Sequence, residues 1–216
     1  MFPIFLSLFI GVFVMNFVLP GIIASVVVTS TSSAAMLSFT SESAFNLATG
    51  AIGATQYTEN FNDLDGYYLN PLSGTMGGVT WSASAFGGLF VGQVNSNAAL
   101  STALAVPLTI DFSGNDVRAL SANFFGTNQG FSVVASFVKI TLLDGTSHTG
   151  YINTSSSTAF LGFHSTDSAI TRITISLPLA FGFAYPTVDN LSIAVIPAPS
   201  ALALIGLAGF SRRRRR

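Results

Sequence analysis

"FSVVASFVKITLLDGTSHTGYI" (residues 131–152) holds the clearest strand pattern in this chain of 216 residues. Every second position of residues 131–137 places apolar side chains on one face, and the apolar positions of residues 134–142 fall on the other. We expect both faces to be covered, as in a β-sandwich. Asp144 and Gly145 follow, and an Asp-Gly pair favours a hairpin because a type I′ turn needs positive φ angles.

Other segments on both sides of this stretch also have strand patterns and are separated by turn residues. They are "GVTWSASAF" (78–86), "VPLTIDF" (106–112), "SANFFG" (121–126), "AITRITISL" (169–177) and "TVDNLSIAVI" (187–196). Between the two ends, only residues 42–50 suggest a short helical turn, and no repeat of fixed period is present. The sequence therefore predicts an all-β domain over residues 36–196, a single antiparallel β-sandwich that is jelly-roll-like.

The composition excludes several functional classes. Only 8% of the residues are charged, and five of the eight basic residues are the last five of the chain. The remaining body has three basic residues against nine acidic ones, so it lacks the clustered positive charge that nucleic acid requires. The mild acidity fits simple solubility. Cysteine is absent, which excludes a disulfide scaffold, a thiolate zinc site and a cysteine nucleophile.

The N-terminal segment, residues 1–35, predicts export. No charged residue occurs from Phe2 to Val28, and small residues follow. Ala34 and Ala35 offer a site for a signal peptidase. The apolar run is also long enough to stay in a bilayer as an uncleaved membrane helix, and Met15 is an alternative start that would shorten it. Both interpretations imply export.

The C-terminal segment, residues 197–216, has three parts. A proline hinge precedes an apolar stretch (201–210), and an arginine cluster follows. A helix over the apolar stretch would reach only about 16 Å, whereas the hydrocarbon core is about 30 Å thick. It is a marginal membrane segment, with arginines that prefer the cytoplasmic side. The alternative is a solvated basic tail. The hinge is Pro197, Ala198, Pro199 and Ser200, and the cluster is Arg212, Arg213, Arg214, Arg215 and Arg216.

This tail resembles the PEP-CTERM sorting signal of Gram-negative and related bacteria. The resemblance implies recognition by an exosortase, a membrane transpeptidase-like protease, followed by transfer to the cell surface or the exopolysaccharide matrix. Ala198 stands where the family's motif has glutamate. The body, from "YTENFNDLDG" (57–66) to "VDNLSI" (188–193), is similar to other bodies found upstream of such tails. It is also similar to carbohydrate-binding jelly rolls, which implies a structural calcium between the first and last strands.

The acidic stretch "ENFNDLDG" (59–66) is a candidate calcium site. Its oxygen-bearing side chains suit calcium, although the spacing is not that of an EF-hand. If the first and last strands are neighbours, Glu59 and Asp63 would share the ion with Asp189 or Asn190. The alternative is a polar turn at Gly66 with side-chain caps.

Catalytic residues are not evident from the sequence. A secreted hydrolase would need converging groups, but the two histidines, His148 and His164, are isolated and no Gly-x-Ser-x-Gly elbow is present. We expect both histidines at the surface or at a sheet edge, and we expect no enzymatic activity.

Several aromatic residues have two interpretations. The single tryptophan, Trp81, alternates with apolar neighbours and is expected in the core. Trp81, Tyr67 and Tyr68 are the candidates for stacking on sugars, with core packing as the alternative for each. Phe86 and Phe90 lie in the glycine-rich stretch "AFGGLFVG" (85–92), and the phenylalanines are expected to fill the core.

The sequence thus predicts an exported, non-enzymatic protein of the bacterial cell envelope or extracellular matrix, sorted through its tail. Its expected partners are an exosortase, a membrane at one or both ends, and exopolysaccharide, without nucleic acid. The alternative function is a carbohydrate-binding or adhesive module of the cell surface.

Overall fold

The structure is a computed structural model that describes residues 36–145, 147–166, 168–178 and 184–196. These residues form fifteen strands and one helix. In chain order they are β1 (Met36–Phe39), α1 (Glu42–Ala51), β2 (Thr55–Glu59), β3 (Gly66–Tyr68), β4 (Leu72–Met76), β5 (Val79–Ser84), β6 (Leu89–Val94), β7 (Asn97–Thr102), β8 (Leu108–Gly114), β9 (Val117–Thr127), β10 (Val133–Val134), β11 (Ser136–Leu143), β12 (Ser147–Thr154), β13 (Phe160–Ser165), β14 (Arg172–Ser176) and β15 (Tyr185–Val195).

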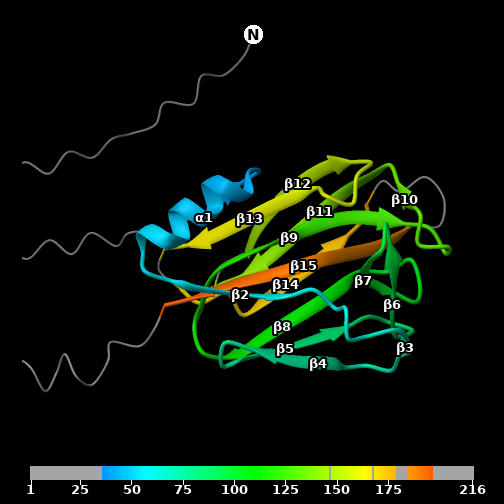
Figure 1. The fold of residues 1–216 in the computed structure, drawn as a ribbon, viewed down its shortest axis with the longest axis horizontal. Coiled ribbons are helices and arrows are strands. Elements are labelled where there is room, and N and C mark those ends of the chain that lie inside the picture. The colour runs from blue at the N-terminus through cyan, green and yellow to red at the C-terminus, as the bar shows by residue number, and fades with distance from the viewer. Residues whose placement is uncertain (1–35, 146, 167, 179–183, 197–216) are drawn as a thin grey trace, which may run out of the picture. The chain divides into compact units, whose positions relative to one another are not determined.

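The strands form two facing sheets, and every pair of neighbouring strands is antiparallel (Figure 1). The large sheet has the order β1-β13-β9-β15-β7-β6-β3, with β10 attached to β9 and β2 attached to β15. The small sheet has the order β12-β11-β14-β8-β5-β4. The predicted all-β sandwich is therefore confirmed.

The chain passes between the sheets in a regular way. From β7 to β15 it crosses from one sheet to the other at each connection except two, the one from β9 to β10 in the large sheet and the one from β11 to β12 in the small sheet. This places β13-β9-β15-β7 in the large sheet and β12-β11-β14-β8 in the small sheet. Eight strands joined in this order have the connections of a jelly roll. Outside these eight strands, β2 pairs with the last strand, β15. Thr55 to Glu59 lie opposite Val195 to Leu191.

The core lies between the sheets and is made by alternate residues of each strand. In β8, Leu108, Ile110 and Phe112 point inward, as the pattern of "VPLTIDF" predicts. In β5, Trp81 lies between Val79 and Ala83 in the same cluster. These residues are buried because strand side chains alternate between the two faces of a sheet.

The stretch that predicts the fold is divided between the two sheets. Val133 and Val134 form the short strand β10 in the large sheet, and β11 begins at Ser136 in the small sheet. The inward face of β11 is apolar as expected. The expectation that both faces are covered is wrong, because Phe137 is only half-buried on the outer face. Phe131, which the sequence pattern places in the strand, lies instead in the loop between β9 and β10 and has a φ of 58°.

The predicted hairpin joins β11 to β12. Leu143 pairs with Ser147, so the loop spans residues 144–146 and is one residue longer than a type I′ turn. Gly145 has a φ of 94°, whereas Asp144 is not among the residues with positive φ.

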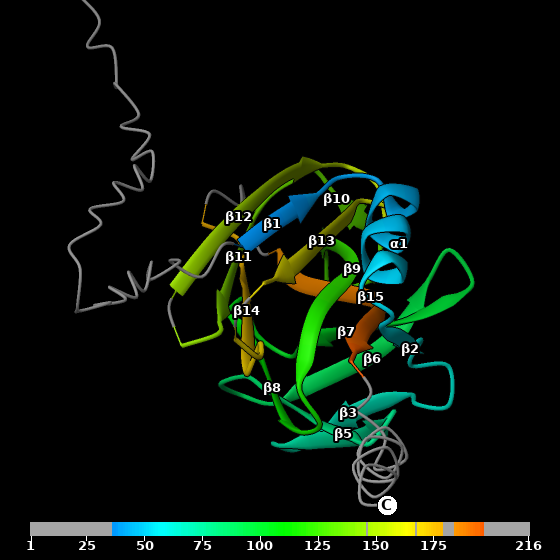
Figure 2. The same ribbon diagram turned by 90° about the vertical axis from the view of Figure 1, so that its left-hand side faces the viewer.

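Helix α1 lies on the outer face of the large sheet (Figure 2). Ser41 begins the helix by accepting a hydrogen bond from the Ala44 amide, at 3.5 Å. Phe45 is fully buried against Phe39 and Phe160. Within the described ranges, no helix has the length and apolar character needed to cross a membrane. The predicted helices of residues 1–35 and 197–216 lie outside these ranges.

Candidate functional site

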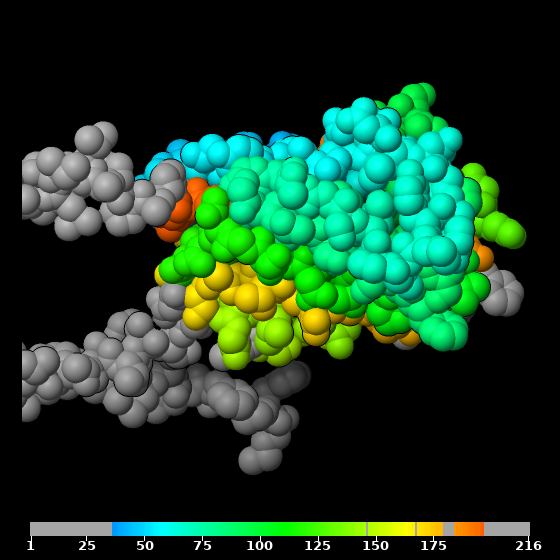
Figure 3. All heavy atoms as spheres, turned by 90° about the horizontal axis from the view of Figure 1, so that it is seen from below, coloured from blue at the N-terminus to red at the C-terminus, as the bar shows by residue number. Residues whose placement is uncertain are grey.

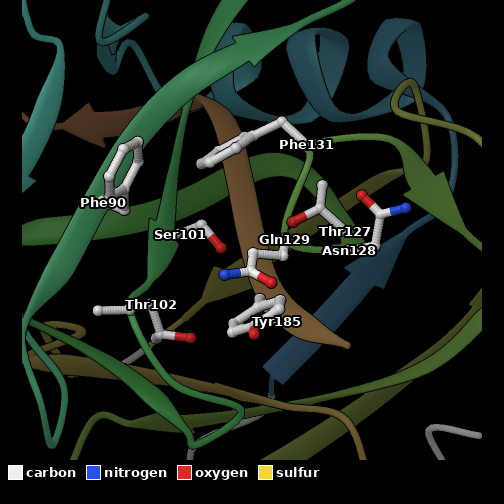
Figure 4. Close-up of a pocket in the computed structure, with 9 residues that line it drawn as sticks. Phe90, Ser101, Thr102, Thr127, Asn128, Gln129, Phe131 and Tyr185 are labelled. Carbon is white, nitrogen blue, oxygen red and sulfur yellow. The ribbon is translucent and has the colours of Figure 1, made fainter. Parts of the chain in front are cut away.

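A groove of about 270 Å³ lies on the outer face of the large sheet. Four strands, β6, β7, β9 and β15, and the loop after β9 form it (Figure 4). Its lining residues are Phe90, Ser101, Thr102, Ala103, Thr127, Asn128, Gln129, Phe131 and Tyr185. This lining consists of aromatic rings, hydroxyl groups and amides and has no ionisable acid or base apart from the tyrosine phenol.

Aromatic rings form the walls of the groove. Phe90 points outward because its neighbours on β6 point into the core, and 36% of its surface is exposed. Its ring centroid is 5.5 Å from that of Phe131. Gly92 makes this arrangement possible, since a Cβ there would be 2.7 Å from the Phe131 ring. Tyr185 is half-buried on another side of the groove.

The floor of the groove is a chain of buried hydroxyl groups from three strands. Thr187 lies 2.8 Å from Thr127 and 3.0 Å from Ser101, measured between side-chain oxygens. Ser101 donates in turn to the Pro186 carbonyl at 3.2 Å. Because these buried hydroxyl groups satisfy one another, the floor is fixed before any ligand arrives.

The loop after β9 is held by Asn128. Its side-chain oxygen accepts hydrogen bonds from the amides of Gly130 and Ser132, at 2.9 and 3.0 Å. The Phe131 amide donates to the Asn128 carbonyl at 3.0 Å. The Gln129 side chain is exposed and has no hydrogen-bond partner among the residues described. Figure 4 shows its amide between Ser101 and Tyr185, where it is free to bind a ligand.

The candidate calcium residues lie near one another along the chain but are engaged locally. The Glu59 carboxylate accepts a hydrogen bond from the Phe61 amide at 2.9 Å, and the Asn60 side chain accepts one from the Asn62 amide at 3.1 Å. These are the caps of a polar turn. Glu59 pairs with Leu191, so the strand of Glu59 does lie beside the last strand, although it is the second strand of the fold and not the first.

The two partner residues on β15 are likewise engaged. Asp189 is buried and accepts a hydrogen bond from the Asn190 amide at 2.6 Å. Burial raises the pKa of Asp189 above its ordinary value, and that hydrogen bond partly opposes the rise. Asn190, with a φ of 51°, lies where the β15–β9 register shifts. Considering only the described part of the chain, no three acidic or histidine side chains, Glu59, Asp63 and Asp189 included, converge to hold a metal. The contacts favour the polar turn.

His148 is part of a cluster that does not have the geometry of a catalytic triad. Its Nε2 lies 3.0 Å from one oxygen of Asp144, and Ser165 donates to the other oxygen at 2.7 Å. In a triad the serine would donate to the histidine. Here the serine hydroxyl is bound to the carboxylate, so the imidazole does not activate it.

His164 is not at the surface, contrary to expectation. It is 9% exposed on β13, and its Nδ1 has no hydrogen-bond partner. Burial, together with the nearby positive charge of Arg118, lowers its pKa below the ordinary value. The side chain is buried because β1 adds a further strand outside β13, with Leu37 opposite His164.

The remaining aromatic candidates are distributed over the body. Trp81 is fully buried, as predicted. Tyr67 is exposed and donates to the Gly87 carbonyl at 3.1 Å, and Tyr68 packs against the core. Phe86 is 80% exposed and does not line the groove. None of the three candidates for sugar stacking, Trp81, Tyr67 and Tyr68, lines the groove. Phe90 does, and the expectation that it and Phe86 fill the core is wrong, because both are exposed.

The candidate cleavage site at Ala34 and Ala35 and the tail determinants, Pro197 to Ser200 and Arg212 to Arg216, lie outside the described residues.

The chain matches no protein-family model and no curated protein. Among solved structures, it is similar to one titled "Carbohydrate binding module family29". The alignment covers 65% of this chain and 88% of that one, with 12% identity and a TM-score of 0.36. A likeness this distant does not establish a shared fold, and the sandwich described above follows from the strand pairing alone.

Proposed function

We propose that the β-sandwich is a carbohydrate-binding module of an exported envelope or matrix protein, and that it is not an enzyme. The groove carries this proposal. Phe90 and Phe131 offer apolar ring faces to the C–H groups of a sugar, and Gln129 offers an unengaged amide to its hydroxyl groups. Such a mixture of aromatic surface and a few convergent polar groups is typical of small-molecule sites.

The ligand expected in the groove is an uncharged sugar. Among the described residues that line it there is no carboxylate, ammonium or guanidinium group, so a charged sugar would lose hydration there without gaining an ion pair from them. Binding should therefore depend little on salt concentration.

Replacing Phe131 with alanine should weaken binding of a neutral polysaccharide about tenfold, or about 1.4 kcal/mol. The reason is the loss of one ring wall. Gln129→Ala should have a similar effect with little disturbance of the packing, since the Gln129 side chain is exposed and makes no hydrogen bond to a described residue. Affinity electrophoresis of the full-length chain in gels that contain β-glucan, mannan or xylan measures both effects.

Phe86→Ala is the matched control, because it removes an exposed phenylalanine outside the groove. It should migrate like the unchanged protein in every gel. If Phe131→Ala and Gln129→Ala also migrate like the unchanged protein, the groove is not the binding site. If no neutral polymer retards the unchanged protein, the proposal of a neutral-sugar module is wrong.

We further propose that the tail sorts the protein to the cell surface. The supporting observation is the order of proline hinge, apolar stretch and five terminal arginines, which resembles the PEP-CTERM signal. In this proposal, an exosortase acts near the hinge while the apolar stretch and the arginines hold the tail at the membrane.

Deleting residues 211–216 should abolish retention at the cell surface. Without the arginines the short apolar stretch has no positive charge to keep it at the cytoplasmic side. Fractionation of the cells that make the protein, followed by immunoblotting, measures the distribution. Replacing the five arginines with lysines preserves the charge and serves as the control. Unchanged retention after the deletion would exclude this role for the tail.

A further inference from the structure

The outer face of the small sheet is a second surface with the chemistry of a binding site. In Figure 3 the segments of this sheet follow one another in the order of pairing, from β4 and β5 through β8 and β14 to β11. Most of its outward side chains are short and hydroxylated. Besides the Arg172–Asp111 ion pair and Leu143, the larger outward side chains form a cluster on β11 and β12, which consists of Phe137, Lys139, Tyr151 and Asn153.

Strand pairing brings these four side chains together. Phe137 lies opposite Asn153, and Lys139 lies opposite Tyr151. Phe137 and Tyr151 are diagonal neighbours, and their rings stack with centroids 5.1 Å apart and planes 17° apart. Directly opposed residues have Cβ atoms roughly 5 Å apart, so the lysine begins beside the aromatic pair. Tyr151 is 54% exposed, which leaves a ring face open to solvent.

Lys139 has no counter-ion among the described residues. The other two described cations do have one, since Arg172 lies 2.5 Å from Asp111 and Arg118 lies 3.9 Å from Asp116. No hydrogen bond of the lysine ammonium, the Tyr151 hydroxyl or the Asn153 amide to another described group is present either. An aromatic platform therefore stands beside a cation, a phenol and an amide that are all unengaged.

We propose that this cluster binds an acidic sugar residue, a uronate, of a matrix polysaccharide. The apolar face of the sugar ring lies on the open ring face of Tyr151, which Phe137 supports by stacking, and the sugar carboxylate pairs with Lys139. Asn153 and the Tyr151 hydroxyl are placed to bind the sugar hydroxyl groups. Charge complementarity selects an acidic ligand over a neutral one, because a neutral sugar would leave the ammonium unpaired.

This site is separate from the groove, because the groove lies on the large sheet. The idea that the ligand is a sugar rests on the proposed function. The two proposals differ in ligand charge and in the residues involved, so they fail independently. A module with both sites would hold neutral and acidic parts of a matrix on its opposite faces.

The experiment compares polygalacturonate with its methyl ester, which has the same backbone without charge. Binding of the full-length chain in mild detergent is measured by biolayer interferometry at low and at high salt. The unchanged protein should bind polygalacturonate at least about tenfold more tightly than the ester at low salt, and this preference should shrink at high salt. Polyglutamate serves as an anionic polymer without sugar rings and should bind weakly.

Variants then assign the effect to the cluster. Lys139→Gln should remove the preference for the acid, and Lys139→Arg should retain it. Tyr151→Ala should weaken binding of the acid about tenfold, whereas the groove variant Gln129→Ala should leave it unchanged. These side chains are exposed or half-exposed, and equal melting curves by circular dichroism confirm that each variant is folded.

The proposal is overturned by equal binding of the acid and the ester, by equal binding of polyglutamate and polygalacturonate, or by undiminished binding by Lys139→Gln. Loss of acid binding in the Gln129→Ala variant would place the ligand in the groove and would also exclude the cluster. A negative result with neutral polysaccharides would count only against the groove.

Discussion

Replacing Trp81 with alanine is expected to lower the free energy of unfolding by about 3–5 kcal/mol. The indole is fully buried in the core between the sheets and meets the Phe61 ring edge to face, with centroids 5.8 Å apart. Gly74 on β4 accommodates it, since a Cβ at that position would be 2.6 Å from the indole. Neighbouring strands are fixed by their hydrogen bonds and cannot close the cavity, so both the transfer term and the cavity term apply.

Chemical unfolding of the full-length chain, followed by far-UV circular dichroism, measures this loss. Thr80→Ala is the matched control, because Thr80 is the exposed neighbour of Trp81 on β5, and its effect should stay within about 0.5 kcal/mol. Trp81→Phe should cost less than half as much as the alanine variant, because it keeps a ring in the site. It also removes an indole N–H that has no hydrogen-bond partner. A loss below about 1 kcal/mol for Trp81→Ala would mean that the indole is not part of a rigid core.

Trp81 illustrates what the sequence determines locally. Its position in "GVTWSASAF" follows from alternation alone, as do the inward residues of β8 and β11. Alternation reports on one strand at a time and needs no knowledge of its neighbours. The all-β class was predictable for the same reason, and the hairpin after Leu143 was predictable from its Asp-Gly pair. Residues 42–50 suggested only a short helical turn, whereas α1 has ten residues.

The groove could not be predicted in this way, because its walls come from distant parts of the chain. Phe90, Phe131 and Tyr185 meet only after β6, β9 and β15 have taken their places in one sheet. Phe131 in particular was assigned to a continuous strand. Its positive φ and the turn held by Asn128 instead direct it over Gly92. The one local signal available was Gly92, which follows the outward-pointing Phe90 by two positions.

For the acidic residues, the pairing of their strands was predictable from the sequence, but the direction of their side chains was not. The strand that carries Glu59, β2, does pair with the last strand, β15, as the calcium hypothesis required, although the first strand of the fold is β1, which pairs with β13. The further step to a shared calcium depended on where each carboxylate points, which strand order does not determine. Glu59 caps its own turn, and Asp189 is buried beside Asn190. Side-chain direction at strand ends and bulges is set by local backbone hydrogen bonds that composition does not reveal.

Replacing Asp144 with alanine is expected to cost about 2–4 kcal/mol of unfolding free energy. The carboxylate is fully buried at the end of β11 in the small sheet. One oxygen accepts the hydroxyl of Ser165, which ends β13 in the large sheet and is 1% exposed. Asp144 therefore joins the two sheets at one end of the core. Alanine would leave the Ser165 hydroxyl buried without this acceptor, and an unsatisfied buried donor costs more than a lost surface contact.

The partner residues of Asp144 provide graded controls for this effect. Ser165→Ala removes one donor but keeps the carboxylate and should cost about 1–2 kcal/mol. His148→Ala removes a partner whose side chain is 23% exposed, and should cost at most about 1 kcal/mol because the pair is partly solvated. Asp144→Asn keeps an acceptor oxygen for Ser165 and should fall between these values and that of the alanine variant. Thermal and urea unfolding of the four variants measure the order. If Asp144→Ala unfolds like the unchanged protein, this end of the sandwich is held by apolar packing alone. If Ser165→Ala alone costs as much as Asp144→Ala, the contact between the sheets accounts for the whole effect and His148 contributes nothing to it.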